Sequence, residues 1–190
     1  MLCYMPGHRV ENRSAKVLAE FITPYFARTN RHFCGHKNTP FKKDSKRYPA
    51  ILKSENAVYL AHSMPLQYKT FGSVFFKRAF MLALNSIYDN GVLKVSGMGS
   101  QGRCTMIRQP ENNRYCVNLL YASPVRRGRA EIIEDITPIY NVALSLKTKE
   151  KVKRVYAVNL EKELDFTEDN GRICFTLPKL ELHESVVIEY

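Results

Sequence analysis

The sequence predicts an α+β protein in two parts, a partial α/β unit over residues 1–90 followed by an antiparallel β-sandwich over residues 91–190. Residues 1–90 combine short apolar runs of strand length with one segment of helical periodicity. From Val92 onward, short runs of alternating apolar and polar residues lie between turn signals, which is typical of a sandwich. A chain of 190 residues, 45% of them hydrophobic, can form one large domain or two small ones.

Three apolar runs predict the strands of the first part. They are AKVLAEFI at residues 15–22, YPAILKS at residues 48–54 and AVYLAHS at residues 57–63. A doubly wound α/β domain alternates strands and helices through about five such units. We therefore expect residues 1–90 to be the later portion of such a domain, with its earlier portion missing.

One amphipathic helix is predicted between a Ser73 N-cap and the stop signal Asn90-Gly91. Its apolar residues share one face at helical spacing: Phe76, Ala79, Phe80, Ala83, Leu84 and Ile87. We expect this helix to leave apolar surface uncovered, and such patches mark interfaces. The helix therefore predicts self-association.

Roughly seven or eight strands are predicted after residue 90. Their inward faces are formed by alternate residues: Tyr115, Val117, Leu119 and Tyr121, then Val142, Leu144 and Leu146, then Ile173, Phe175 and Leu177, and finally Val186, Ile188 and Tyr190. Asn170-Gly171 predicts a two-residue hairpin turn, because both residue types tolerate positive φ angles.

The net charge of +11 raises the question of a nucleic-acid partner. The excess lies in residues 1–90, which carry 14 Lys and Arg against 5 Asp and Glu. It is spread through predicted loops without the basic and aromatic interleaving of a nucleic-acid platform. The distribution favours a solvated basic surface, so nucleic acid is not the expected partner.

Five cysteines without paired spacing, and no signal-peptide pattern, predict a cytoplasmic protein with reduced thiols. No apolar run approaches the roughly 20 residues that cross a bilayer, so no membrane partner is expected.

No nucleotide-binding or nucleophile-elbow motif occurs in the sequence. Glu134-Asp135 is the acidic pair embedded in apolar sequence, but adjacent residues of a strand point to opposite faces. The pair predicts a turn or bulge instead of a catalytic couple. We expect no catalytic residue in this chain and no cofactor.

The stretch RHFCGHKNTP at residues 31–40 places His32, Cys34 and His36 at alternate positions. An extended backbone would put them on one face, which allows a metal site, a binding loop or ordinary packing. Zinc sites use three or four ligands, commonly on CxxC or HxxxH spacings. His32 and His36 have the HxxxH spacing, but the chain has no CxxC pair, and its remaining cysteines and histidines are scattered singly. No metal site is therefore predicted, and the other two interpretations stay open.

Six stretches together resemble the C-terminal region of bacterial glycoside-hydrolase-like proteins, similar to the β-galactosidases of glycoside hydrolase family 42. They are PYFARTNRHFCGHKNTP (residues 24–40), YPAI (48–51), VYLAHSM (58–64), NRYCVNLLYASPVRRG (113–128), IEDITPIYNVALSL (133–146) and DNGRICFTLPKLELHESVVIEY (169–190). The chain departs from the family pattern at Ala27 and Gly35, where the family has polar residues.

The resemblance implies a catalytic barrel upstream, then a flavodoxin-like or glutamine-amidotransferase-like trimerisation domain, then a small β-sandwich. Residues 1–90 would be the C-terminal part of the trimerisation-type domain, and residues 91–190 the sandwich. The chain would be the non-catalytic oligomerisation portion of a sugar hydrolase, meeting carbohydrate through that parent enzyme. It would form a homo-oligomer or associate with an upstream catalytic portion.

In that architecture the loop at residues 31–40 would lie on the domain's rim and reach a sugar site. Arg28, His32 and His36 would donate hydrogen bonds to sugar hydroxyls, while Phe33 and Cys34 would pack inward as anchors. Pure loop packing is the alternative for these residues. For the whole chain, the alternative function is a free-standing basic module that binds nucleic acid or another polyanion.

Overall fold

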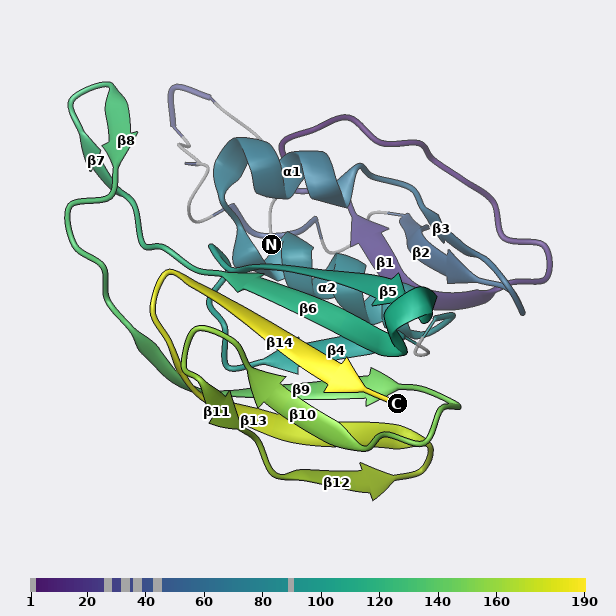
Figure 1. Cartoon of the computed structure of the whole chain (residues 1–190). Coiled ribbons are helices and arrows are strands. Elements are labelled where there is room, and N and C mark those ends of the chain that lie inside the picture. Colours follow the sequence, from purple (N-terminus) through teal and green to yellow (C-terminus); the bar gives the residue numbers. More distant parts are fainter. Residues whose placement is uncertain (1–2, 26–28, 32–34, 36–38, 43–45, 89–90) are drawn as a thin grey trace. The chain divides into compact units, whose positions relative to one another are not determined.

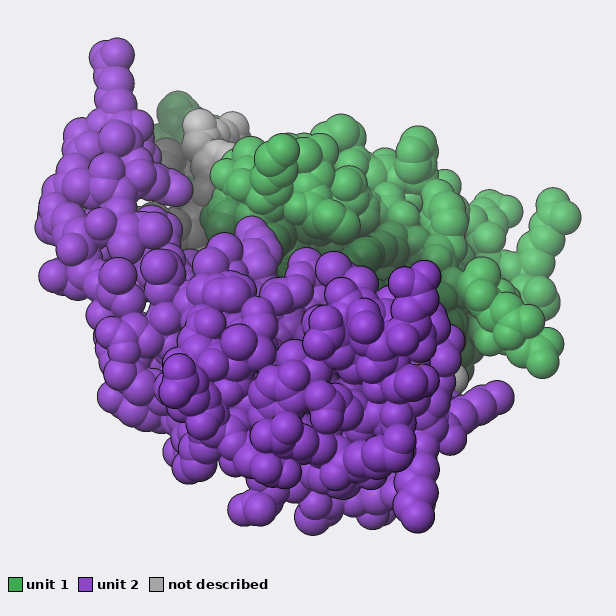
Figure 2. Space-filling view, viewed as in Figure 1, with its two compact units in different colours: residues 1–89 green, residues 90–190 purple. Residues whose placement is uncertain are grey.

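The computed structural model describes residues 3–25, 29–31, 35, 39–42, 46–88 and 91–190 (Figure 1). The chain divides into two compact units, Met1–Asp89 and Asn90–Tyr190, which Figure 2 colours separately. Each unit has its own hydrophobic cluster. No helix within the described ranges is long and apolar enough to cross a membrane.

The N-terminal unit contains a sheet in the order β1-β2-β3. Its strands are β1 (Lys16–Ile22), β2 (Arg47–Lys53) and β3 (Val58–Leu60), so the apolar runs form strands as predicted. Both described pairs are antiparallel, whereas a flavodoxin-like domain has parallel strands. The reason at β2 and β3 is the connection of residues 54–57, which is too short to join parallel strands. The overall α+β class is confirmed.

Two helices follow the sheet, where the sequence predicted one. Helix α2 (Val74–Asn85) begins after Ser73 as predicted, but it ends before Asn90-Gly91. The sequence did not predict helix α1 (Met64–Phe71), which has only eight residues and buries the polar Gln67 among its apolar positions; it ends at Gly72, which has φ 66°. Four residues form the buried cluster of this unit within the described ranges: Ile51, Met64, Phe76 and Ala83.

The C-terminal unit is the predicted antiparallel β-sandwich, and every residue from 91 to 190 is described. One sheet has the order β11-β10-β14-β6-β5, and the other has the order β12-β13-β9-β4 (Figure 1). The strands are β4 (Leu93–Ser96), β5 (Arg103–Gln109), β6 (Arg114–Leu120), β9 (Ile139–Lys147), β10 (Arg154–Ala157), β11 (Lys162–Glu163), β12 (Phe166–Asp169), β13 (Arg172–Leu180) and β14 (His183–Glu189). A separate hairpin pairs β7 (Val125–Arg127) with β8 (Ala130–Ile132), and a 3-10 turn at Pro110–Asn112 joins β5 to β6.

The inward faces predicted from alternation form one core between the two sheets. Val117 and Ile188 from one sheet and Leu146 and Leu177 from the other are fully buried. Tyr121 and Tyr190, which end their predicted faces, are only partly buried against this core. The predicted hairpin turn is also confirmed, since Asn170 and Gly171 have φ angles of 50° and 70° between β12 and β13.

A buried carboxylate fixes one turn of the sandwich. Glu184 on β14 is 2% exposed. It accepts hydrogen bonds from the backbone N–H groups of Asn159 (2.8 Å), Leu160 (3.1 Å) and Ser185 (2.9 Å). Burying a charge is tolerated when hydrogen bonds satisfy it, so this carboxylate holds the turn after β10 against β14.

A second polar cluster joins β5, β6 and the end of the chain to the turn at residues 148–150. Glu150 accepts hydrogen bonds from Thr148, from the Tyr115 hydroxyl at 2.9 Å and from Arg108 at 2.6 Å. Arg108 also donates to the Tyr190 hydroxyl at 3.2 Å. The pKa of Glu150 falls to about 2, mainly through the bond from Thr148 and against the opposing effect of burial.

We expect Glu184→Ala to lower the free energy of unfolding of the C-terminal unit by about 3 kcal/mol, because three N–H groups lose their buried acceptor. Glu184→Gln keeps the side-chain volume and an acceptor oxygen, so its loss should be smaller. Urea unfolding followed by tyrosine fluorescence measures both. Equal stability of the wild type and Glu184→Ala would show that the turn does not need the carboxylate.

The Glu150 cluster should make stability depend on pH. A carboxyl whose pKa falls from 4.5 to about 2 on folding adds stability above pH 4.5 and loses it as the pH falls toward 2. The difference in Tm between the wild type and Glu150→Gln should therefore be largest at neutral pH and shrink across that interval. Thermal unfolding at a series of pH values measures it. A difference that does not change with pH would contradict the assignment.

Candidate functional site

The three predicted sugar-contacting residues, Arg28, His32 and His36, lie outside the described residues, as do the two anchors predicted beside them. In and beside the loop the structure describes residues 29–31, Gly35 and residues 39–42. The Thr39 hydroxyl donates a hydrogen bond to the Gly35 carbonyl. The sugar-contacting role of the loop stays a prediction.

A cavity of about 740 Å³ opens in the N-terminal unit, and we call it the aromatic pocket. Its walls come from the start of the chain, from β1 with residues 39–41, and from both helices. Five aromatic residues line it: Tyr4, Phe21, Phe41, Phe71 and Phe76. Its polar lining residues are Cys3, Glu20, Thr39, Gln67 and Ser73. Sites for small ligands typically combine such an apolar wall with a few polar groups.

One lining residue of the aromatic pocket, Gln67, is completely buried. Its oxygen accepts the backbone N–H of Tyr4 at 3.3 Å, and its nitrogen donates to the Cys3 sulfur. Glu20 also lines the pocket, and its carboxylate accepts a hydrogen bond from Arg47 at 3.0 Å. The start of the chain is thus tied to helix α1 through one side chain.

Cys3 lies 3.5 Å from the Nδ1 atom of His62, which raises the question of a cysteine nucleophile. Burial raises the pKa of the Cys3 thiol and lowers the pKa of His62. Both shifts favour the neutral thiol and imidazole, whereas nucleophilic attack needs a thiolate. The pair therefore packs and hydrogen-bonds without activation. No group of three His, Cys, Asp or Glu side chains in the described ranges is placed to hold a metal ion.

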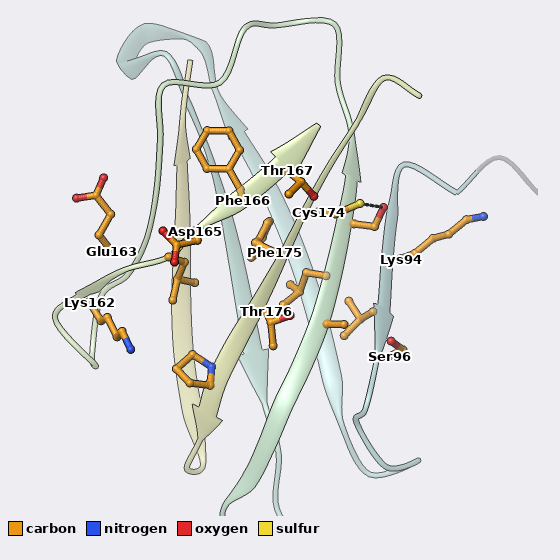
Figure 3. Close-up of a pocket in the computed structure, with 16 residues that line it drawn as sticks. Lys94, Ser96, Lys162, Glu163, Asp165, Phe166, Thr167, Cys174, Phe175 and Thr176 are labelled. Atoms are coloured by element: carbon orange, nitrogen blue, oxygen red, sulfur yellow. Dashed lines mark hydrogen bonds between the residues drawn. The ribbon is translucent and has the colours of Figure 1, made fainter. Parts of the chain in front are cut away.

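A second cavity, of about 780 Å³, lies along the sheet of β12, β13, β9 and β4 (Figure 3). Its floor includes Ser145 and Thr176, which alternate with the core residues Leu144 and Leu177 and so lie on the outer face. Cys174 donates to Ser145 at 3.4 Å, the dashed line in Figure 3. The cavity therefore combines small polar side chains with larger residues such as Phe166 and Pro178.

Two carboxylates, Glu163 and Asp165, line that second cavity. The Glu163 side chain is 63% exposed and is paired with Arg154 at 3.3 Å. A general acid needs an apolar enclosure that this carboxylate lacks. The cavity therefore does not present a catalytic pair.

The acidic pair Glu134-Asp135 follows β8, outside any strand of the C-terminal unit. Glu134 accepts two hydrogen bonds from Arg127, at 2.9 and 2.6 Å. Both side chains of this ion pair are partly exposed. Glu134 is thus held by a surface contact, in an irregular connecting segment where the sequence predicted a turn or bulge.

The sequence predicted neither cavity. Several lining residues of the aromatic pocket were assigned to predicted elements, such as Phe21 to a strand, Ser73 to a helix N-cap and Phe76 to the helix stripe, but nothing in the sequence indicated that they converge. Gln67 and Glu20 carry no local motif. A buried polar residue shows itself only once the surrounding elements are packed.

No protein-family model and no curated protein matches the chain. Among solved structures, it is similar to α-L-fucosidase isoenzyme 2 from Paenibacillus thiaminolyticus, with a TM-score of 0.86 and 35% identity over 97% of this chain. The chain spans 28% of the length of that enzyme. A cycloisomaltooligosaccharide glucanotransferase from Paenibacillus sp. matches 57% of this chain and 19% of its own, with 18% identity and a TM-score of 0.40 that carries no argument.

The first of these matches gives the class of protein that the chain resembles, a region of a glycoside hydrolase. The particular enzyme matched is a fucosidase, and a relation to β-galactosidases rests on the sequence resemblance alone.

Proposed function

We propose that the chain is a non-catalytic, oligomer-forming accessory portion of a glycoside hydrolase. The observation that carries the proposal is the match to a fucosidase at a TM-score of 0.86 and 35% identity, which includes almost all of this chain and 28% of that enzyme. The second cavity and the pair Glu134-Asp135 supply no catalytic carboxylates. The reaction in this proposal belongs to another part of the enzyme.

The finer assignments are part of the same proposal. Residues 1–90 form the trimerisation-type portion, and residues 91–190 form the accessory sandwich. An α-L-fucoside is favoured over a β-galactoside as the parent enzyme's substrate, because the matched enzyme is an α-L-fucosidase. A bacterial parent and a cytoplasmic location complete the proposal, the latter supported by the free thiols of the four described cysteines.

Apolar side chains on helix α2 support the oligomer-forming role. Val74, Phe75 and Leu82 are each more than half exposed. Contiguous exposed apolar surface is uncommon on monomers and marks interaction sites. A second copy, or the catalytic portion, is the proposed partner for this face.

The competing function is a free-standing module that binds a polyanion, and the net charge of +11 favours it. Binding of that kind would weaken steeply as salt rises, because counterions are released from the polyanion. Association through the apolar face of α2 would not weaken in this way as salt rises.

We expect the purified chain to hydrolyse neither nitrophenyl α-L-fucoside nor nitrophenyl β-D-galactoside above the buffer rate, because glycoside hydrolysis needs two carboxyl groups facing across a cleft. In contrast, the Paenibacillus fucosidase should stay folded and active when its matching region is replaced by this chain, and should fail when the region is deleted. Turnover by the chain alone that Asp165→Asn or Glu163→Gln abolishes would overturn the proposal, as would an inactive, misfolded chimera.

The loop at residues 31–40 is proposed to contact the sugar in the assembled enzyme. In the active chimera, His36→Ala should lower kcat/KM by about tenfold or more, as loss of a hydrogen bond to a charged or polar sugar group does, and should leave Tm unchanged. Arg28→Ala and His32→Ala test the same role. An unchanged kcat/KM in all three variants would leave loop packing as the explanation.

A further inference from the structure

We propose that the aromatic pocket of the N-terminal unit binds a neutral saccharide. This inference rests on the proposed function, which makes carbohydrate the relevant ligand, and it adds a binding site on this chain itself. The volume of about 740 Å³ lies within the range of ligand sites, roughly 300 to 1,000 Å³.

The rim of the pocket suits the apolar faces of a sugar ring. Tyr4, Phe41 and Phe71 line the pocket, and each is about half exposed. The rings of Tyr4 and Phe71 lie 5.1 Å apart and are tilted by 47°, so they form an angled wall. An aromatic face carries partial negative charge, which attracts the weakly positive C–H groups of a pyranose.

One polar lining group suits the hydroxyl groups of a sugar. Gln67 has no exposed surface and its amide bonds Tyr4 and Cys3, so it holds the pocket wall together and does not meet the ligand. The Glu20 carboxylate has about four acceptor sites, so it can accept sugar hydroxyls while it keeps Arg47 at 3.0 Å.

Charge favours a neutral ligand over an ion. Glu20 is the one charged residue among the described lining residues, and Arg47 already neutralises it.

Polarity also favours a sugar over an apolar side chain of a protein partner. An apolar occupant would cover the partly exposed Glu20 carboxylate without offering hydrogen bonds to its remaining acceptor sites, and burying unpaired polar groups is costly.

The backbone that carries the Phe41 ring is held by contacts with residues 23–25. Phe41 forms a β-bridge with Pro24. On either side of it, the backbone N–H of Tyr25 donates to the Pro40 carbonyl at 2.8 Å, and that of Lys42 donates to the Thr23 carbonyl at 3.1 Å. Because this backbone is ordered before binding, less conformational entropy is lost when a ligand binds against Phe41.

The test is a titration of the ¹⁵N-labelled chain with L-fucose and with D-galactose, followed by amide chemical shifts. At least one sugar should shift the amides of Tyr4, Gln67 and Phe71. Phe41→Ala should weaken that binding by about tenfold. Phe75→Ala is the matched control, because Phe75 has the same exposed fraction as Phe41, 59%, and does not line the pocket.

Several results would overturn the proposal. They are the absence of shifts with both sugars at saturating millimolar concentrations, shifts confined to other amides, and equal weakening by Phe41→Ala and Phe75→Ala. Shifts of the pocket amides by N-acetylphenylalaninamide and by neither sugar would identify a pocket for a protein side chain instead. Phe71→Ala serves as a second variant if Phe41→Ala does not fold.

The outcome is separable from that of the proposed function. Sugar binding is measured on this chain without any catalytic part, whereas the chimera experiment measures folding and turnover. An active chimera with no sugar binding would retain the accessory function and discard the pocket. Sugar binding together with an inactive chimera would retain the pocket and discard the accessory function.

Discussion

Burial of alternate apolar side chains between two sheets is the interaction on which the C-terminal unit depends. Val117 on β6 and Leu146 on β9 have no exposed surface. Because side chains alternate along a strand, a slip of one residue would turn a whole inward face to solvent, so the register is strongly fixed. The register of β9 and β13 places Ser145 and Thr176 outside. On β14, Glu184 reaches the turn after β10 and accepts hydrogen bonds from its backbone N–H groups. The polar features of this unit thus follow from its core.

The N-terminal unit lacks a core of comparable size. Within its described residues the buried cluster comprises Ile51, Met64, Phe76 and Ala83, while Phe75 and Leu82 on the same helix as Phe76 stay largely exposed. Small domains bury a smaller fraction of their surface and often need further support. A unit with these properties fits the accessory role, in which a larger assembly covers the surface that the unit leaves open.

Features that depend on neighbouring residues were predicted from the sequence, and features that depend on residues far apart in the chain were not. The strand faces and the Asn170-Gly171 turn rest on neighbouring residues, so the sequence predicted them correctly. Strand pairing in the N-terminal unit rests on connections. The short link between the runs at residues 48–54 and 57–63 already allowed a hairpin, as β2 and β3 form, whereas β1 and β2 pair antiparallel across a long connection that carries no such signal. Helix α1 is only eight residues long and buries the polar Gln67, so its periodic signal is weak. The aromatic pocket joins Tyr4, Phe41 and Phe71 from separate parts of the chain, which no single stretch of sequence reveals.

The saccharide site and the oligomer-forming surface proposed for the N-terminal unit would together have a further consequence. A pocket with half-exposed aromatic rims buries only part of a sugar ring, so a single site of this kind binds weakly. If copies of the chain associate through helix α2, each copy brings its own pocket to the same assembly. Sites joined in this way act at a high effective concentration on a ligand that can span them, and the combined affinity rises without any new contact. Under the proposed function, an oligosaccharide with several ends would be held near the catalytic portions by pockets that are individually weak, and a free monosaccharide product would leave readily.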